Sequence, residues 1–288
     1  GSPTKEKKMP ISNSTRPETR FAPSLRRIMA YSRLYPFMEQ HSLNVVQMLP
    51  GGDDFFGDTL RTDIYAVANG GGASAASPVI TANSLNGVCD FVTGTAGDST
   101  ASSQLSSGLA FRGDRSCVLV ALLSLSVITG VKVEVGFTDV ATDAGAVAVR
   151  ATPTFNADDC ALWVFDTNDN TTWEGIAANN KDTSPMANVE AALTPVADER
   201  EWLMVELLRN DSTNNQCAVI FRRFTEAGLM TYGPEVGSSS AIGGQADPQG
   251  PNSNVLLTPW VYVEARNATS KTLSLDYWNA WQFRTVPT

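Results

Sequence analysis

The stretch from residue 116 to residue 165 constrains the fold more than any other part of this sequence. It holds three apolar runs rich in Val, Leu and Ala, and Gly, Asp, Asn or Pro residues separate the runs. Runs of this length between turn residues are typical of buried β-strands. In the middle run, the valines of residues 131–135 alternate with Lys132 and Glu134. This period of two predicts a strand with one apolar and one solvated face. The stretch therefore favours an antiparallel β-sandwich.

Three further pairs of strand-like segments follow, and a polar turn separates the members of each pair. The turns, residues 166–170, 210–215 and 267–270, are rich in Asp, Asn, Ser and Thr. These side chains favour turns because they form hydrogen bonds with the nearby backbone. The sequence therefore predicts three hairpins: 161–165 with 172–176, 202–208 with 217–224, and 255–265 with 272–283.

The chain divides at Pro50-Gly51-Gly52, a strong break in the apolar pattern. Its 288 residues exceed one average domain, but a single large β-sandwich can run to about 200–250 residues. We therefore predict an N-terminal arm at residues 1–50 and one all-β body at residues 51–288.

The predicted arm differs from the body in charge and in apolar content. It has eight Lys or Arg and three acidic residues, so it carries +5, whereas the whole chain carries −9. Residues 1–22 lack the apolar side chains to form a core, which predicts an extended segment. From Pro23 to Pro36 the spacing predicts a short amphipathic helix. A helix this short is marginal alone, so we expect it to dock on a partner. The partner-binding candidates are Arg16, Arg20, Leu25, Arg26, Arg27, Ile28, Met29 and Arg33. A solvated tail is the alternative.

Several classes of protein do not fit the composition. The net charge of −9 argues against nucleic acid as a partner. No apolar run reaches the roughly 18–20 residues that span a bilayer, so no membrane is expected. The sequence lacks phosphate-binding and dinucleotide-binding glycine motifs and closely spaced cysteine pairs, so neither a cofactor nor a metal is predicted. We expect the four cysteines, Cys89, Cys117, Cys160 and Cys217, to be buried free thiols.

Candidate catalytic and metal-binding residues are few. Glycoside hydrolysis needs two carboxylates about 5–10 Å apart, and Glu134, Glu206 and Glu264 lie mid-strand, where they could converge on one face. We expect them instead to be residues of a solvated face. Residues 166–170 match the first half of a calcium loop, but Thr171 replaces the required glycine, which favours a hairpin turn. His41 is the single histidine and lies in the arm. No catalytic residue is predicted.

Six tryptophans could stack on sugar rings if they lie on an exposed face: Trp163, Trp173, Trp202, Trp260, Trp278 and Trp281. Most are expected in the core. Trp173, beside a polar turn, and Trp281, near the end of the chain, are the two candidates for sugar stacking.

With these residues in view, the sequence resembles the concanavalin A-like (lectin/glucanase) jelly rolls of tailed-phage virion proteins. The segments that carry the resemblance are residues 54–58, 133–139, 162–165 with Trp173, and 275–278 with Arg284. It covers roughly residues 51–288, leaving the arm unmatched. The resemblance implies an all-β antiparallel jelly-roll sandwich preceded by the extended arm and short helix.

The same resemblance implies a non-enzymatic structural protein of a phage virion. It would be a capsid decoration or cement protein on the capsid surface, anchored through the arm to the major capsid protein or another virion protein. A homo-oligomer is expected, and a trimer is our guess because capsids offer threefold positions. The alternative is a jelly-roll protein of a phage tail that binds carbohydrate as a lectin does or degrades polysaccharide. The shared fold does not decide between them.

Overall fold

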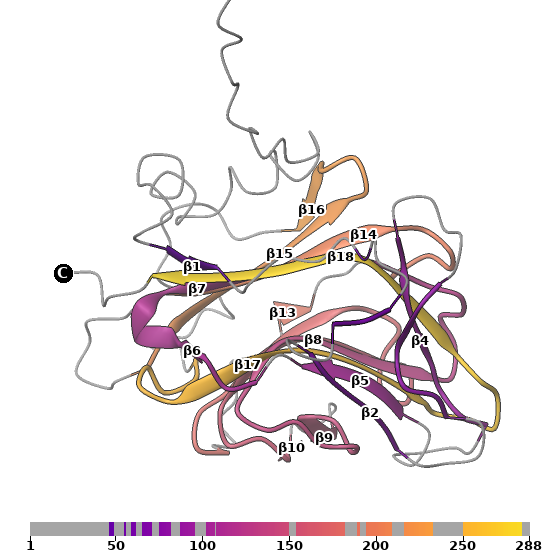
Figure 1. Ribbon diagram of the computed structural model, residues 1–288, viewed down its shortest axis with the longest axis horizontal. Coiled ribbons are helices and arrows are strands. Elements are labelled where there is room, and N and C mark those ends of the chain that lie inside the picture. The colour runs from indigo at the N-terminus through magenta and orange to yellow at the C-terminus, as the bar shows by residue number, and fades with distance from the viewer. Residues whose placement is uncertain are drawn as a thin grey trace, which may run out of the picture.

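The structure is a computed structural model of the chain. It describes residues 46–48, 55, 59–61, 65–70, 75–81, 87–95, 102–106, 108–149, 154–181, 189–190, 194–208, 216–232 and 250–283. These residues form two antiparallel sheets that lie face to face, as Figure 1 shows. The one helical element among them is a 3-10 turn at Gly113–Arg115. In these ranges no helix has the length and apolar character needed to cross a membrane.

Sheet A is built around two long neighbouring strands, β7 and β18. Its strands in spatial order are β16 (Met230–Tyr232), β15 (Ala218–Thr225), β14 (Glu201–Leu208), β7 (Cys117–Leu125), β18 (Thr272–Phe283), β4 (Cys89–Val92) and β3 (Val79–Ile80). A short strand, β1 (Val46–Met48), pairs with the end of β18, where Val46 lies opposite Phe283. Sheet A therefore begins before the predicted boundary at residue 50.

Sheet B is built around β8 and β17. Its strands in spatial order are β13 (Val189–Glu190), β12 (Glu174–Ala178), β11 (Cys160–Asp166), β8 (Val131–Thr138), β17 (Leu256–Ala265), β5 (Ser102–Ser106) and β2 (Ala66–Asn69). The two-residue strand β6 (Phe111–Arg112) pairs with the start of β17. A separate two-stranded ribbon, β9 (Val147–Val149) with β10 (Thr154–Phe155), lies outside sheet B on the side away from sheet A (Figure 1).

The core between the sheets confirms the predicted β-sandwich. The alternating valines of β8 point into it together with Trp163 of β11 and Phe221 of β15. The rings of Trp163 and Phe221 meet edge to face, with centroids 5.3 Å apart, which ties sheet B to sheet A. All four cysteines are buried free thiols, as predicted. Burial raises the pKa of Cys117 and of Cys160 well above the ordinary value.

Two of the three predicted hairpins are present. β11 pairs with β12, and β14 pairs with β15. The third prediction is wrong: segments 255–265 and 272–283 form β17 and β18, which belong to different sheets. β17 pairs with β8, and β18 pairs with β7. Because the turn after residue 265 crosses from one sheet to the other, it joins two strands that are not paired.

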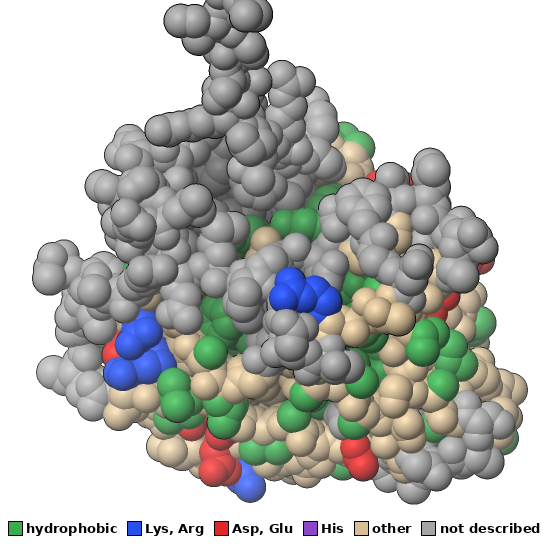
Figure 2. All heavy atoms as spheres, in the orientation of Figure 1, with side chains coloured by type: hydrophobic (Ala, Val, Ile, Leu, Met, Phe, Trp, Pro, Cys, Tyr) green, Lys and Arg blue, Asp and Glu red, His purple; other side chains and the backbone are tan. Residues whose placement is uncertain are grey.

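The charges on the surface are dispersed. Figure 2 shows one face, on which the acidic and basic side chains of the described residues form a few small separate groups, some of mixed sign, among polar and apolar ones. Large apolar side chains with about half their surface exposed also occur, such as Leu109 at 52% and Leu256 at 47%. On the part of this face that the structure describes, no continuous patch of one charge sign forms.

Candidate functional site

The outer face of sheet B, turned away from sheet A, carries two of the three mid-strand carboxylates, Glu134 of β8 and Glu264 of β17. The segment that contains β9 and β10 covers this face. Ala146, Val147 and Phe155 of that segment form an apolar cluster with side chains of the sheet, among them Trp260. The sheet's second face is therefore a second core and not an open groove.

Glu134 is sealed beneath this cover. Its carboxylate accepts hydrogen bonds from the backbone N–H of Ala146 at 2.7 Å and of Val147 at 3.0 Å. The indole N–H of Trp260 donates to it at 3.0 Å, and Lys132 Nζ lies 2.9 Å from Oε1. The Glu134 and Lys132 side chains are 0% and 1% exposed. The expectation that Lys132 and Glu134 face solvent is therefore wrong, because a segment that follows β8 in the chain folds back over them.

Glu264 belongs to a network on the same face. Its carboxylate is 2.8 Å from Tyr262 Oη and accepts a hydrogen bond from Arg266 Nη1 at 3.0 Å. Arg266 also donates two hydrogen bonds to Asp166, at 2.6 and 3.1 Å. Burial and the neighbouring Glu264 and Glu134 raise the pKa of Tyr262. These side chains satisfy one another, which is the requirement for buried polar groups.

The third mid-strand carboxylate lies elsewhere. Glu206 belongs to β14 of sheet A, on the outer face of that sheet, and pairs with Arg222 at 2.8 Å. Both side chains are buried. Glu206 therefore does not converge with Glu134 and Glu264, and all three carboxylates are buried instead of solvated.

The segment considered as a half calcium loop is a hairpin turn. Asp166 accepts a hydrogen bond from the backbone N–H of Asn168 at 3.1 Å, which closes the turn, and Arg266 binds its carboxylate. Among the described residues, no three His, Cys, Asp or Glu side chains are grouped so as to hold a metal ion.

Neither candidate for sugar stacking presents its ring at the surface. Trp173 and Trp281 are both 0% exposed. Trp173 packs against Phe165, with ring centroids 5.6 Å apart, in the core between the sheets. The sequence suggested that Trp173 is exposed because it follows a polar turn. In the structure Trp173 directly precedes β12, and its side chain already points into the core.

The predicted partner-binding residues lie outside the described residues. These are Arg16, Arg20, Leu25, Arg26, Arg27, Ile28, Met29 and Arg33. The same holds for His41, the extended segment predicted at residues 1–22 and the short helix. Attachment to a virion through the arm therefore stays a prediction.

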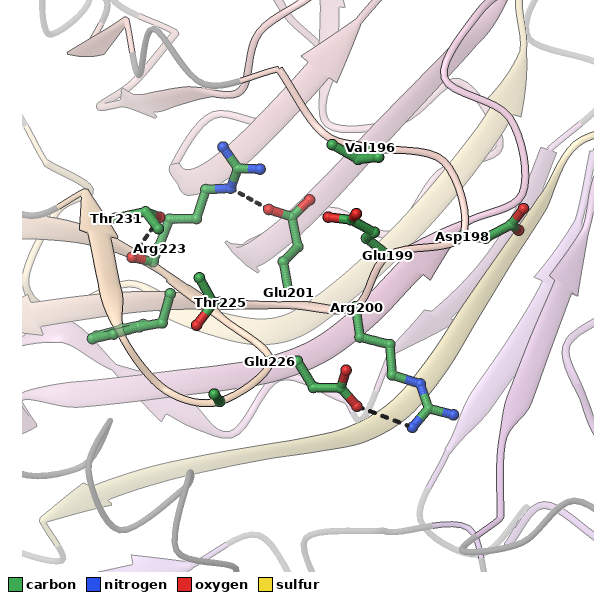
Figure 3. A pocket seen from close by; sticks show the side chains of 11 residues that line it. Val196, Asp198, Glu199, Arg200, Glu201, Arg223, Thr225, Glu226 and Thr231 are labelled. Carbon is green, nitrogen blue, oxygen red and sulfur yellow. Dashed lines mark hydrogen bonds and ion pairs between the residues drawn. The ribbon is translucent and has the colours of Figure 1, made fainter.

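An open pocket lies at the end of sheet A where β14 begins and β15 ends (Figure 3). We call it the β14–β15 pocket. It encloses about 1010 Å³, the upper end of the range for small-molecule sites. Its lining consists of residue 196 and residues 198–200 before β14, Glu201 in β14, residues 223–227 from β15 and the following turn, and Thr231 in β16.

Glu201 lies buried at the inner side of this pocket. Trp173 Nε1 donates a hydrogen bond to its Oε1 at 2.8 Å, and Arg223 Nε donates to its Oε2. The pKa of Glu201 is raised, because burial disfavours the charged carboxylate more than Arg223 and Trp173 stabilise it. The nearby carboxylate of Glu199 raises it further. Figure 3 shows the Glu201 and Arg223 side chains pointing toward each other.

Of the remaining charged side chains of the pocket, some form ion pairs and others do not. Arg200 Nη1 lies 2.9 Å from Asp276 and 3.5 Å from Glu226, so both arginines of the lining are paired with carboxylates. Asp198 and Glu199 are exposed. Within the described part of the pocket, their side chains make no hydrogen bond or ion pair. Of these two unpaired carboxylates, Glu199 lies beside the buried Glu201–Arg223 pair, whereas Asp198 points away from it (Figure 3).

Sequence reasoning did not select these residues. The available signal was the run Asp198-Glu199-Arg200-Glu201, four charged residues directly before an apolar strand. A charged run of this kind usually marks a solvated turn, and here it does so for Asp198 and Glu199. What the run does not reveal is that β15 and β16 supply Arg223 and Thr231 opposite it.

Comparison with known proteins identifies the fold. No protein-family model matches the sequence, and no curated protein matches it either. A protein of unknown function from Shewanella oneidensis MR-1 is similar in structure, with a TM-score of 0.55 and 12% sequence identity, covering 89% of this chain and 96% of that chain. An endo-1,3-beta-glucanase from Streptomyces sioyaensis is similar with a TM-score of 0.51 and 10% identity, covering 84% of this chain and 98% of that chain.

These likenesses, together with the two packed antiparallel sheets, give the chain a concanavalin A-like jelly-roll fold, as predicted. The prediction that the protein is not an enzyme is overturned by the second likeness, because a glucanase has this fold over almost the whole of its length. Neither of these similar structures points to a phage virion. At 10–12% identity the likenesses establish the fold, and function must be argued from the pocket.

Proposed function

We propose that the protein is carbohydrate-binding and that the β14–β15 pocket holds the saccharide. The observation that carries this proposal is the combination of an open cavity of about 1010 Å³ with a mixed lining, in which carboxylates, arginines and threonine hydroxyls lie beside apolar side chains such as Phe224. A saccharide presents many hydroxyl groups, each of which donates and accepts hydrogen bonds. Glu199 offers an unpaired acceptor. The Thr225 hydroxyl accepts a hydrogen bond from the N–H of Leu229 and can still donate one, and the Thr231 hydroxyl donates to the carbonyl oxygen of Arg223 and can still accept one.

The fold supports the same class of ligand. A protein that has this fold is named as an endo-1,3-beta-glucanase, an enzyme that acts on a saccharide. Because one fold hosts many functions, this likeness favours the class without naming the sugar. The sealed outer face of sheet B leaves the β14–β15 pocket as the better candidate among the described residues.

Titration with neutral β-linked hexasaccharides tests this proposal. We expect one oligosaccharide per chain to bind, and we expect Ala227→Trp, which fills the pocket with a large ring, to weaken binding at least about tenfold (about 1.4 kcal/mol). Val149→Trp places the same ring at an exposed position of β9 and should leave binding unchanged. If the Ala227→Trp variant binds the saccharide as tightly as the wild type, the saccharide binds outside this pocket. If the wild type shows no binding with a dissociation constant of about 1 mM (about −4 kcal/mol) or tighter, the proposal is wrong.

Hydrolysis of the bound saccharide is a second candidate function. The placement of Glu199 beside the buried Glu201 favours it (Figure 3), together with the burial that raises the pKa of Glu201. A glycosidase needs one carboxyl group that stays protonated to donate a proton to the leaving oxygen, and a second carboxylate nearby. Glu199 would supply the second and Glu201 the first, which requires that saccharide binding free the Glu201 carboxyl group from the hydrogen bond that Arg223 donates to it. Water would then add across the glycosidic bond.

Reducing-end release from a 1,3-β-glucan measures this activity. Glu201→Gln keeps the shape of the side chain and an acceptor for Trp173 but cannot give up a proton. It should abolish release while keeping binding. Asp169→Asn, at an exposed position of the β11–β12 turn, should retain full activity. Undiminished release by Glu201→Gln would exclude the proposed acid.

A further inference from the structure

We propose that the outer face of sheet A, turned away from sheet B, is the docking surface for residues 23–36 of this same chain. The spacing of that segment predicts a short amphipathic helix. The predicted helix would then have its partner within its own chain and not in another protein.

The outer face of sheet A is apolar and buried. Four neighbouring strands, β18, β7, β14 and β15, direct every second side chain into the core between the sheets. The side chains between them point to the outer face, and most are large and apolar. Six of these are each at most 3% exposed: Val118, Val120, Trp202, Met204, Phe224 and Trp281. The buried ion pair of Glu206 and Arg222 lies among them. Such a face requires a covering layer.

No described strand supplies this layer. Each described strand belongs to sheet A, to sheet B or to the ribbon of β9 and β10, and the ribbon packs on sheet B. Two polar atoms on the outer face of sheet A, Asn279 Oδ1 and Trp281 Nε1, are buried without a hydrogen-bond partner. Buried polar atoms are normally paired. The covering segment therefore has to bring polar groups as well as apolar ones.

Composition selects the covering segment. Outside the described ranges, only residues 1–45 and residues 233–249 form stretches longer than seven residues. Residues 233–249 contain few large apolar side chains, Val236 and Ile242, which cannot cover four strands. Residues 23–36 are far richer in them, with Leu25, Ile28, Met29, Tyr31, Leu34 and Tyr35. These residues therefore match the face in apolar character.

The same segment brings a suitable polar group. In a helix, Ser32 follows Ile28 by four residues and so falls on the side that carries the apolar residues. A serine hydroxyl can accept a hydrogen bond from Trp281 Nε1 or donate one to Asn279 Oδ1. The predicted apolar side of residues 23–36 thus includes a group of the kind that the two buried polar atoms lack.

The chain enters the described body beside this face. β1 begins at Val46, which lies opposite Phe283 of β18, and Met48 lies opposite Trp281. Residues 37–45 link the predicted helix to β1 and can span up to about 30 Å. The helix itself would be about 21 Å long at 1.5 Å per residue. It could therefore cross the four strands, whose neighbours lie about 4.8 Å apart.

Charge favours the same placement. Residues 1–45 hold eight basic and three acidic side chains and carry +5. Because the whole chain carries −9, the remaining residues carry −14. A basic segment is attracted to an acidic body. Docking on its own body therefore gains from charge as well as from apolar contact.

Thiol labelling of the full chain measures whether the face is covered. Val120→Cys places a thiol at the centre of the face, because Val120 lies opposite Met204 of β14 and Asn279 of β18. Val205→Cys makes the same replacement on the inner face of the same sheet and reports global unfolding. The four native thiols are buried, so the wild type gives the baseline. With an unaltered arm, a maleimide should label both introduced thiols slowly.

A charge on the apolar side of the predicted helix should uncover the face. Ile28→Asp should raise the labelling rate of Val120→Cys at least about tenfold, which is the change expected when one Ile side chain loses its buried contacts. It should leave Val205→Cys slow. Ala30→Asp adds the same charge on the opposite side of the helix and should leave both thiols slow.

Four outcomes would overturn the proposal. Rapid labelling of Val120→Cys with an unaltered arm would show that the face is open. An unchanged rate in the Ile28→Asp variant would assign the cover to another segment. An increase of the same size at Val205→Cys, or from Ala30→Asp, would show a general loss of stability and not local uncovering. Faster labelling of Val120→Cys on dilution would assign the cover to a second copy of the chain.

Discussion

Glu134 is the residue on which the buried polar network under β9 and β10 depends. It accepts hydrogen bonds from two backbone N–H groups and one indole, and it pairs with Lys132. Burying two charges costs desolvation energy that is recovered only when every partner is in place. Removal of one member leaves the other charge buried without a partner. The stability lost in this way is larger than the stability that the intact pair provides relative to apolar side chains of the same size.

The variant Glu134→Ala tests this dependence. It leaves the Lys132 ammonium buried without its carboxylate, and we expect the free energy of unfolding to fall by about 3–5 kcal/mol. Glu226→Ala breaks the exposed contact with Arg200 and should cost about 0–1 kcal/mol. Urea denaturation of the two variants measures the difference. If the two variants lose equal amounts of unfolding free energy, the buried network does not depend on Glu134.

Asp139 gives a pH dependence of known sign. Burial raises its pKa, and the neighbouring carboxylates of Asp159 and Asp158 raise it further. A carboxyl group with a raised pKa in the folded state stabilises the protein below its unfolded pKa of about 3.9. That contribution is lost as the pH rises through the folded pKa. The native state therefore favours protonated Asp139.

Replacement of this carboxyl by an amide should flatten the stability profile. Asp139→Asn keeps the acceptor for the backbone N–H of Asp158, which lies at 3.2 Å, but does not ionise. Between pH 4 and 7 its free energy of unfolding should change less steeply than that of the wild type. Denaturation midpoints across this range measure the slope. A variant that loses stability as steeply as the wild type on raising the pH would contradict the assignment.

At the scale of strands, Gly175 of β12 sets how closely the two sheets approach. A Cβ atom added there would lie 2.4 Å from a ring carbon of Phe221 in β15. Gly175→Ala should therefore lower the free energy of unfolding by about 1–3 kcal/mol, since overpacking forces side chains out of their preferred positions.

Phe221→Leu shortens the opposing side chain and should restore part of this loss. Denaturation of both single variants and the double variant gives the coupling energy. We expect the double variant to be clearly more stable than the sum of the two single losses predicts. Strict additivity would show that the two residues do not limit the approach of the sheets.

The elements that the sequence predicts well are those with a local signal. The alternation in residues 131–135 indicates a strand, and the polar turn at residues 166–170 indicates a hairpin; β8 and the β11–β12 pair match both. What covers a strand has no local signal. The polar face of β8 has the pattern of a solvated face, and only the later segment that contains β9 and β10 makes it a buried one.

Pairing between distant segments was equally hidden. The polar turn after β17 has the same composition as a hairpin turn, but β17 continues sheet B and β18 continues sheet A. The β14–β15 pocket likewise joins residues 196–201 to residues 223–231 at one end of a sheet. The charged run before β14 can be recognised from composition. The pairing of β14 with β15, which places residues 223–231 beside that run, cannot.

At the scale of the whole molecule, β1 decides where the folded body begins. β1 pairs with the last three residues of β18, so that Met48 lies opposite Trp281. On its other side this end of β18 pairs with β7, where Trp281 lies opposite Val118. Without β1, the end of β18 would become an unpaired edge. The body therefore needs residues 46–48, which precede the boundary at Pro50 that the sequence predicts.

Two truncations separate these boundaries. Removal of residues 1–45 keeps β1, and removal of residues 1–50 deletes it. We expect the shorter protein to be less stable than the longer one by about 1–3 kcal/mol, because a few backbone hydrogen bonds of about 0.5–1.5 kcal/mol each are lost. Amide hydrogen exchange at residues 281–283 should be faster in the shorter protein. Gln47→Pro in the full chain removes one backbone donor from β1 and should move both measurements in the same direction. Indistinguishable unfolding and exchange in the two truncated proteins would mean that β18 holds its end without β1, and the folded body would then begin after Pro50.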